Sequence, residues 1–233
     1  MVTGAAKRIG KAIAVGLARA GADIALHYRS SADQAHATAS EIATIGSRVE
    51  LFQADLAQAQ QIERLFEAIG EKFGRLDVLV NNAAVHGRTP IDSLTPDQWD
   101  EQFAVNARAA ALCIRWAIPL MADGGAIVNI VDISAEKAWG GYPAYCASKA
   151  ALLALTKSAA KALAPRIRVN AVSPGIADWP EGIADQVKQK VLAQVPMNRV
   201  GSPDDVAAAV VFLAQQDYVT GQNLRVDGGW HMA

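Results

Sequence analysis

The stretch Thr3-Gly4-Ala5-Ala6-Lys7-Arg8-Ile9-Gly10 stands between a short apolar start, residues 1–3, and a helical run over residues 10–20. A glycine turn between a strand and a helix lets backbone N–H groups and the positive end of the helix approach a pyrophosphate. Arg8 stands where the usual spacing has its middle glycine, so an ordinary strand-to-helix turn is the alternative. Because a strand usually has about five to six residues, either further residues precede Met1 or the first strand is unusually short.

The rest of the chain alternates between apolar runs typical of strands and longer helical stretches. The predicted strands cover residues 22–28, 47–53, 76–80, 126–131, 167–172 and 224–226, and the predicted helices cover 10–20, 32–45, 58–73, 96–121, 144–163, 184–194 and 203–215. Strands that alternate with long helices imply βαβ units and a parallel sheet. We therefore predict an α/β fold, a Rossmann-type doubly wound parallel sheet, in a single domain over residues 1–233.

Composition excludes several classes of partner. The 233 residues include 22 Lys and Arg against 23 Asp and Glu, so no overall field attracts nucleic acid or an anionic membrane. The most apolar stretch, residues 109–122, is interrupted by Arg115 and Pro119 and is shorter than the roughly 20 residues of a membrane span. Cys113 and Cys146 lack metal-ligand spacing and are too few for a disulfide framework. We expect a cytoplasmic protein with a small-molecule substrate, no metal, and neither a nucleic-acid nor a membrane partner.

The end of the next predicted strand indicates which dinucleotide the turn would bind. Sites that prefer NAD usually place Asp or Glu about 20 residues after the glycines, on the ribose 2′-hydroxyl. This chain has His27-Tyr28-Arg29-Ser30-Ser31 there, with no carboxylate to repel a 2′-phosphate. Arg29 and the two serines can bind such a phosphate, and Lys7 and Arg8 can add charge. The alternative for Arg29 is that it is a solvated arginine at a strand end with no ligand. We predict NADP (as NADPH) rather than NAD as the cofactor.

Two further strand ends point to the same crevice, because ligands bind at the carboxyl ends of strands in open α/β sheets. Asp55-Leu56 follows one predicted strand, and Asp55 is placed either to accept a hydrogen bond from adenine or to cap the next helix. Asn81-Asn82-Ala83-Ala84 follows the next strand, where small residues allow a ribose to approach closely.

Tyr145-Cys146-Ala147-Ser148-Lys149 places a phenol and an ammonium at i and i+4, on one face of a helix. A tyrosine of pKa about 10 is a poor acid at neutral pH. A cation one turn away favours the phenolate and lowers that pKa, which gives a group able to deliver a proton as hydride arrives. A chance pair of this spacing is common, so a structural role is the alternative.

The chain resembles the short-chain dehydrogenase/reductase family over residues 1–230. The resemblance rests on the glycine turn, residues 81–84, Asn106, the pair Tyr145 and Lys149, Pro174-Gly175, and the closing Val226-Asp227-Gly228-Gly229. It implies that Tyr145 is the proton donor, that Lys149 binds the nicotinamide ribose and tunes Tyr145, and that Asn106 holds a proton-relay water. It also implies that Pro174-Gly175-Ile176 flanks the nicotinamide.

Asp132 departs from the family pattern, which usually has a serine thirteen residues before the tyrosine. Ser134 is nearby but out of register. A serine hydroxyl can donate to a carbonyl oxygen, whereas an ionised aspartate only accepts. An aspartate therefore suits a substrate that offers N–H donors, or one whose ring nitrogen is protonated during reduction. With Arg8 and residues 27–31, this aspartate makes the chain resemble the pteridine reductase branch, whose members reduce dihydropterins, and in some cases pterins or folates, with NADPH.

That resemblance implies a cytosolic homotetramer that packs through the helices holding Asn106 and Tyr145. Where well-known pteridine reductases have a serine and then an aromatic residue that stacks on the pterin, this chain has Ala84 and His86. The imidazole of His86 either stacks on a heterocycle or faces solvent from a loop. Trp139 either lines the pocket or packs at a subunit contact, and Trp179 lies in a loop of the kind that closes over active sites.

The expected substrate contacts are Arg8, Ala84, His86, Asp132, Tyr145 and Trp179. We predict a reductase that uses NADPH to reduce a C=N bond of a pterin. The rivals are an NADPH-dependent carbonyl or 3-oxoacyl thioester reductase and a catalytically idle NADP-binding sensor or scaffold.

Overall fold

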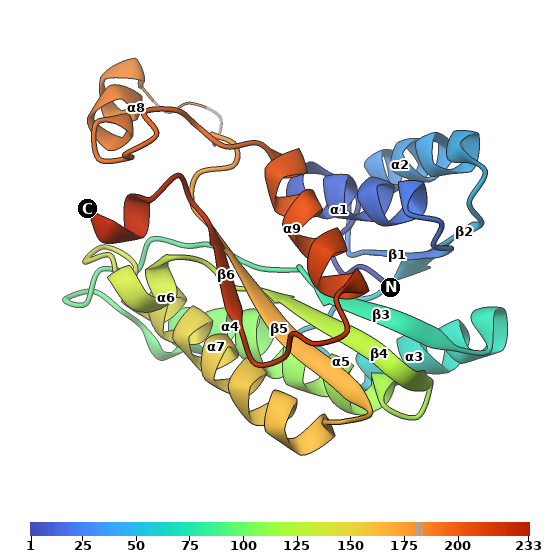
Figure 1. Cartoon of the computed structure of the whole chain (residues 1–233). Helices are drawn as coiled ribbons and strands as arrows, with labels where there is room; N and C mark the ends of the chain where they lie inside the picture. Colours follow the sequence, from blue (N-terminus) through green and yellow to red (C-terminus); the bar gives the residue numbers. More distant parts are fainter. Residues whose placement is uncertain (180–181, 183) are drawn as a thin grey trace.

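The computed structural model describes residues 1–179, 182 and 184–233, and its centre is a parallel β-sheet with helices on both faces (Figure 1). Its strands are β1 Ile24–Tyr28, β2 Val49–Gln53, β3 Leu76–Asn81, β4 Met121–Ile130, β5 Ile167–Pro174 and β6 Asn223–Val226. Parallel pairing joins β1 to β2 and runs from β3 through β4 and β5 to β6. Val2 links the two parts by parallel bridges to Leu26 and Val80. This order confirms the predicted doubly wound α/β fold.

Two layers of helices enclose this sheet. One face is covered by α1 Arg8–Arg19, α2 Ala32–Ile45 and α9 Pro203–Gln215, and the other by α3 Ala59–Phe73, α4 Pro96–Phe103, α5 Ala109–Ala117 and α7 Pro143–Leu163 (Figure 1). The short helix α6 Ser134–Lys137 follows β4, whereas α8 Asp185–Leu192 lies apart from the sheet. Among the described residues, no helix has the length and apolar character needed to cross a membrane.

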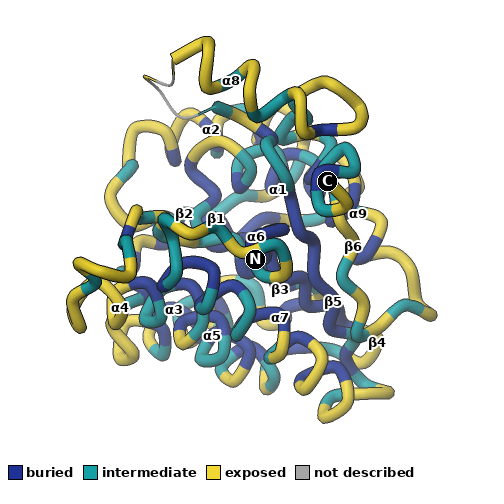
Figure 2. The backbone as a smooth tube through the Cα atoms, turned by 90° about the vertical axis from the view of Figure 1, so that its left-hand side faces the viewer, coloured by how far each residue is buried: buried dark blue, intermediate teal, exposed yellow. Residues whose placement is uncertain are grey.

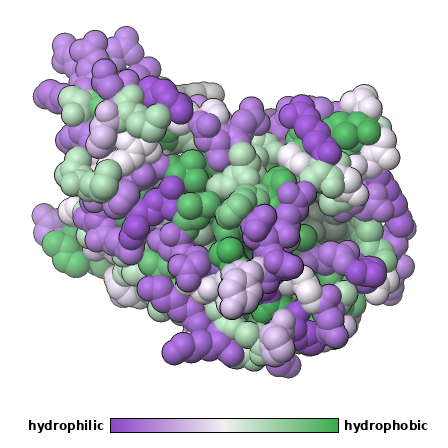
Figure 3. All heavy atoms as spheres, in the orientation of Figure 1, coloured by the Kyte–Doolittle hydropathy of each residue, from purple (hydrophilic) through white to green (hydrophobic). Residues whose placement is uncertain are grey.

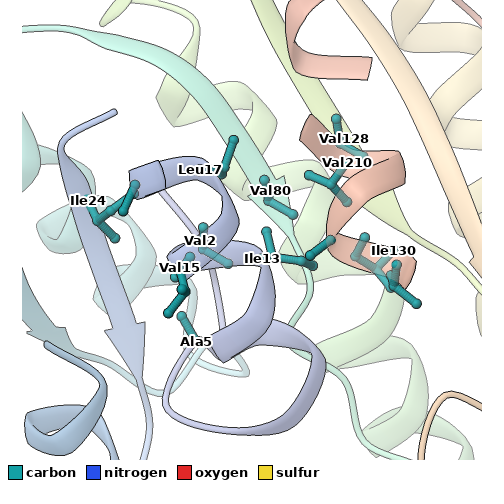
Figure 4. Close-up of a cluster of buried hydrophobic side chains, with 14 of the residues drawn as sticks. Val2, Ala5, Ile13, Val15, Leu17, Ile24, Val80, Val128, Ile130 and Val210 are labelled. Carbon is teal, nitrogen blue, oxygen red and sulfur yellow. The ribbon is translucent and has the colours of Figure 1, made fainter. Parts of the chain in front are cut away.

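Each layer has its own apolar core. Ile13 and Leu17 of α1 and Val210 of α9 are buried against Val128 and Ile130 of β4 (Figure 4). The opposite core collects side chains of α3, α5 and the other face of the strands, including Ile62, Phe66 and Ile114. The central strands are therefore largely buried on both sides, as the tube in Figure 2 shows for β5.

The predicted first strand is reduced to one bridged residue. Val2 is fully buried between β1 and β3, where its N–H donates to Ala25 O and its carbonyl accepts from the His27 N–H. The Thr3 N–H then donates to Val80 O, and the glycine turn begins at once. Val2 therefore acts as the central strand of the sheet, and it brings the turn to the crevice between β1 and β3.

One predicted helix is wrong. The run over residues 96–121 is α4, then a π-helical turn at Ala104–Arg108, then α5, which ends at Ala117. Pro119 cannot donate a backbone hydrogen bond to continue the helix, and β4 already begins at Met121. The other predicted elements differ mainly at their ends: β1 and β2 each begin two residues later than predicted, and β5 extends to Pro174.

Candidate active site

The glycine turn is clamped by the segment that follows β3. The Asn82 side-chain amide donates to the carbonyl oxygens of Thr3 at 2.9 Å and Gly4 at 3.1 Å. The Thr3 hydroxyl oxygen accepts from the N–H groups of Asn82 at 2.8 Å and Ala83 at 2.9 Å. The Asn82 side chain is thus occupied by the turn, and the close approach of a ribose to residues 81–84 stays a prediction. Thr3, which the sequence analysis missed, is identifiable only by its place before the first glycine.

The turn itself has no room for side chains at its two glycines. Gly4 has φ of 62°, in the left-handed region. A Cβ on Gly10 would lie 2.2 Å from the Gly4 carbonyl oxygen and 2.5 Å from the Asn82 amide nitrogen. Backbone therefore lies bare at the start of α1, which is the surface that a pyrophosphate needs. The residues present fit a dinucleotide.

His27 is a structural residue and not a cofactor ligand, which corrects the prediction. It is 2% exposed. Its Nδ1 accepts from the Gly4 N–H at 3.0 Å, and its Nε2 lies 3.0 Å from Ala54 O, so the neutral ring with its proton on Nε2 satisfies both. Burial lowers the pKa of His27 from 6.5 to about 4, against the smaller raising effects of the bond to Ala54 and the charge of Asp55. This imidazole ties the glycine turn to the ends of β1 and β2.

The residues after β1 present a small polar surface. Lys7, Arg29 and Ser30 are exposed and Ser31 is partly exposed, and within the described ranges their side chains make no ion pair or hydrogen bond. Tyr28 instead packs against the core. These free cationic and hydroxyl groups suit a 2′-phosphate.

Asp55 and Leu56, after β2, have mainly structural contacts. One carboxylate oxygen of Asp55 accepts from the Ala57 N–H at 3.0 Å, which forms a turn before α3. The N-cap of α3 is Gln58, so Asp55 does not cap this helix as the alternative expected, and its bond to adenine stays a prediction. The Leu56 side chain is buried in the core.

Three charged or acidic groups meet at the ends of β4 and α7. The Tyr145 hydroxyl donates to Oδ2 of Asp132 at 2.9 Å, and Oδ1 of Asp132 accepts from the Ser134 N–H at 2.7 Å. Lys149 Nζ donates to Ile130 O at 2.9 Å and lies 5.8 Å from the centre of the Tyr145 ring. Tyr145 and Lys149 are both buried. The structure thus unites the three residues that the spacing singled out.

The pKa of Tyr145 moves in the opposite direction from the one predicted. Burial raises it well above 10, and the charge of Asp132 and its hydrogen bond raise it further, because a phenolate would lie against a carboxylate. Burial lowers the pKa of Lys149 from 10.5 to about 8, opposed by the attraction of Asp132. Tyr145 therefore keeps its proton, because burial and the neighbouring carboxylate both disfavour the phenolate.

Asn106 lies in the π-helical turn, with its side chain fully buried. Its amide oxygen accepts from the Val85 N–H at 2.8 Å, and its amide nitrogen donates to Val85 O at 2.9 Å and to the Ser148 hydroxyl at 3.0 Å. These bonds fix the 85–89 loop to α7. The side chain is engaged by protein groups, and the relay water that the resemblance implies for Asn106 stays a prediction.

Aromatic rings surround Tyr145. His86 stacks on Tyr142 with ring centres 4.7 Å apart and meets Tyr145 edge-on at 4.6 Å. Trp139 lies parallel to Tyr145 at 6.4 Å and contacts Trp230 at 5.9 Å. Burial lowers the pKa of His86, the charge of Asp132 raises this pKa, and the charge of Lys149 lowers it. The His86 ring therefore faces the site and not only solvent. Tyr142, the N-cap residue of α7 and three residues before Tyr145, is a neighbour that the sequence analysis missed.

Several other predicted residues follow β3 and β5 or lie in the glycine turn. Ala84 is exposed just after β3. Gly175 donates its N–H to Val226 O at 3.0 Å, and a Cβ there would lie 2.9 Å from Asp227. Arg8 reaches Asp178, beyond β5, through Nε at 3.2 Å. Trp179 makes no contact with another aromatic ring in the part of the chain that the structure describes, and Pro180, which follows it, lies outside the described residues.

A separate cavity of about 560 Å³ lies behind the aromatic residues, between β6, the start of α9 and residues 195–201. Figure 3 shows apolar side chains in the hollow beside α8. Ile176 and Val195 belong to its wall and also pack, with Ile133, in the cluster around Trp230. Tyr145 does not line this cavity, whereas Ile176, which the sequence predicts beside the nicotinamide, does.

The arrangement can hold a dinucleotide along the crevice and protonate a substrate at its far end. A phosphate-binding turn lies at one end, and a protonated phenol, a carboxylate and an ammonium lie at the other. Hydride and proton delivered together are the requirements of a reductase of carbonyl or imine bonds.

Comparisons with known proteins agree with this geometry. The family profile described as enoyl-(acyl carrier protein) reductase matches residues 4–231. The chain is 37% identical over 239 residues to the 3-oxoacyl-[acyl-carrier-protein] reductase FabG of Staphylococcus aureus strain Mu50, covering 100% of this chain and 97% of that protein.

Solved structures agree as well. A short-chain dehydrogenase/reductase from Serratia marcescens has a TM-score of 0.95 at 37% identity, covering 99% of this chain and 96% of that one. A blue fluorescent protein from a metagenomic library, in complex with NADPH, has a TM-score of 0.93 at 38% identity, covering 98% and 96%. By sequence and by structure, the chain belongs to the short-chain dehydrogenase/reductase family.

Proposed function

We propose that this protein is a pteridine reductase-like enzyme, which uses NADPH to reduce a C=N bond in a pterin of the dihydropterin or dihydrofolate type. The observation that carries the proposal is the 2.9 Å hydrogen bond from the Tyr145 hydroxyl to Asp132. It places an acceptor-only carboxylate beside the proton donor, where the family usually has a serine. An amino-heterocycle offers N–H donors to such a carboxylate, whereas a ketone offers none.

The cofactor assignment rests on the polar surface after β1. Arg29, Ser30 and Ser31 would bind the 2′-phosphate, and the bare backbone at the start of α1 would bind the pyrophosphate. Pro174, Gly175 and Ile176 would flank the nicotinamide, whose reduced ring supplies the hydride. A relative's structure with NADPH bound, 38% identical to this chain, supports this assignment.

The chain's own residues supply the proton. The Asp132 carboxylate accepts hydrogen bonds from N–H groups of the substrate's amino-substituted ring. With Asp132 engaged in this way, the Tyr145 hydroxyl turns towards the ring nitrogen. As hydride reaches the C=N carbon, the nitrogen takes the proton from the Tyr145 oxygen, so that one C–H and one N–H bond form. Lys149, 5.8 Å from the ring centre, stabilises the phenolate that is left. Proton uptake from solvent then restores Tyr145.

The aromatic wall supports a planar substrate. His86, Tyr142 and Trp139 offer ring faces and edges within 6.4 Å of Tyr145 or of one another. Aromatic pairs of this kind contribute about 0.5–1.5 kcal/mol beyond the area that they bury. A flexible acyl chain gains less from such surfaces than a bicyclic heterocycle does.

A second candidate is a 3-oxoacyl thioester reductase, which the name of the Staphylococcus aureus relative favours. In that reaction Asp132 would have to act as a protonated acid that donates to the ketone oxygen. The third possibility is an idle protein that binds NADP without turnover. The buried and hydrogen-bonded side chains of Tyr145 and Lys149 argue against a protein without turnover.

The test is NADPH oxidation with dihydrobiopterin and, separately, with an acetoacetyl thioester. We expect turnover of the pterin, and Asp132→Ser should lower pterin turnover far more than NADPH affinity. Turnover of the thioester alone would refute the pterin assignment. NADPH binding without turnover across a broad pterin and carbonyl panel would support the idle protein, and equal losses of turnover and affinity in Asp132→Ser would make Asp132 structural.

We further propose a cytoplasmic homotetramer that packs through α4, α5 and α7, as the family resemblance implies. Light scattering coupled to size exclusion should give four times the 24.6 kDa chain mass. A monomeric mass would refute this assembly.

A further inference from the structure

An ion pair joins two segments of the crevice that are far apart in the chain. Arg8 Nε lies 3.2 Å from Oδ2 of Asp178, and the two residues are 170 positions apart. Arg8 is the first residue of α1, in the glycine turn, and Asp178 follows β5 beyond the Pro174-Gly175-Ile176 segment. Their side chains are 52% and 48% exposed, so the pair lies at the surface of the molecule.

The sheet order shows how far this pair reaches. Between Val2, which leads into the turn, and β5 stand β3 and β4. Neighbouring strands lie about 4.8 Å apart, so the two backbones that carry the pair leave strands roughly 14 Å apart. The segments after β3 and β4, which include Asn82 and Asp132, lie between them. The ion pair therefore crosses the mouth of the crevice, from its phosphate end to its nicotinamide end.

Arg8 holds this position in an unfavourable backbone conformation. Its φ is 53°, in the left-handed region that costs a residue with a side chain roughly 1–2 kcal/mol. A glycine, which the usual spacing has at this place, would adopt that conformation freely. Arg8 therefore supplies something that glycine cannot.

The Arg8 guanidinium has N–H donors beyond the one that bonds to Asp178. Only Nε bonds to Asp178, and in the described portion of the chain the two terminal nitrogens make no other hydrogen bond. A guanidinium carries five N–H donors in a rigid fork that matches phosphate oxygens. Asp178 thus restrains the Arg8 side chain through Nε and leaves the two terminal nitrogens available for phosphate oxygens.

We propose that Arg8 and Asp178 form a clasp over the dinucleotide, in which Asp178 is a positioning residue that holds Arg8 across the bound pyrophosphate. The inference rests on the proposed NADPH function. Because the pair carries no net charge, its effect comes from the fixed direction of Arg8 and not from a general field. The clasp should lower the dissociation rate of NADPH more than it changes the association rate.

The test measures NADPH dissociation by stopped-flow displacement with excess NADP⁺. Asp178→Asn should raise the dissociation rate about three- to fivefold, the effect of a well-directed ion pair near the surface, and change the association rate less than twofold. In an Arg8→Gln background, the same substitution should have no further effect. The matched control is Asp185→Asn, which also removes one negative charge but breaks only the local pair with Lys188 on α8. It should leave both rates unchanged.

Each contrary result is distinct. If NADPH dissociates from Asp178→Asn as fast as from the wild type, Asp178 has no role in holding NADPH and the clasp is overturned. Slower dissociation from the variant would also overturn the clasp, because Asp178 would then compete with the phosphates for Arg8. An effect in Asp185→Asn as large as in Asp178→Asn would overturn it too, because the charge alone would then matter. Failure of the wild-type chain to bind NADPH would overturn the cofactor assignment itself, whereas intact binding with unchanged dissociation overturns only the clasp.

Discussion

Acidification should destabilise the fold through one buried imidazole, that of His27. Its pKa falls from 6.5 in the unfolded chain to about 4 in the folded one, so between those values the unfolded chain binds more protons. Stability due to His27 is therefore present above pH 6.5 and is lost as the pH falls towards 4. At about 1.4 kcal/mol per tenfold change in proton affinity, the loss is about 2 kcal/mol at pH 5 and about 3 kcal/mol at pH 4.

The structural reason is that a protonated imidazole has no acceptor for the Gly4 N–H, which now donates to Nδ1 at 3.0 Å. Urea unfolding of the wild type and of His27→Gln, measured from pH 7 to pH 4, isolates the effect, because a glutamine can keep both bonds without titrating. The wild type should lose stability relative to this variant by the amounts above. His36→Gln, which replaces an exposed histidine of α2, is the control and should follow the wild type. A constant difference between the wild type and His27→Gln at all pH values would refute the reasoning.

Three further predictions concern catalysis and the turn. Tyr145→Phe should lower kcat by about 100- to 10,000-fold, the usual range for loss of a proton donor, with an NADPH Kd measured by fluorescence titration that stays within threefold. Since the pKa of Lys149 is lowered to about 8, kcat/KM should fall above pH 8 as the ammonium loses its proton, and Lys149→Arg should abolish that alkaline fall in a pH–rate profile. Gly10→Ala should cost about 3 kcal/mol in urea unfolding because its Cβ would lie 2.2 Å from Gly4 O, whereas Gly140→Ala, with open space around it, should cost little.

Elements with local start and stop signals were predictable from the sequence. α9 begins at Pro203 behind the Ser202 cap, whose hydroxyl accepts from the Asp205 N–H. α2 ends at Ile45, before Gly46 with φ of 95°. The π-helical turn at Ala104–Arg108 has no such signal. It is held by bonds from Asn106 to residues 21 and 42 positions away, which no local pattern contains.

The candidate site was predictable in its membership but not in its electrostatics. The spacing of Asp132, Tyr145 and Lys149 places all three together correctly. The predicted lowering of the Tyr145 pKa was wrong because the i, i+4 rule describes only the helix surface. The structure directs Lys149 Nζ to Ile130 O and the phenol to Asp132. His27 was misread for a related reason, since a polar residue at a strand end can face inwards as readily as outwards.

The stacking of Trp139 on Tyr145 and its contact with Trp230, at 6.4 Å and 5.9 Å, also give the protein a built-in optical probe. Indole emits near-ultraviolet light that a reduced nicotinamide absorbs, so a cofactor seated beside Tyr145 would quench these tryptophans by resonance energy transfer. Filling and emptying of the crevice can then be followed by intrinsic fluorescence, without attaching a label.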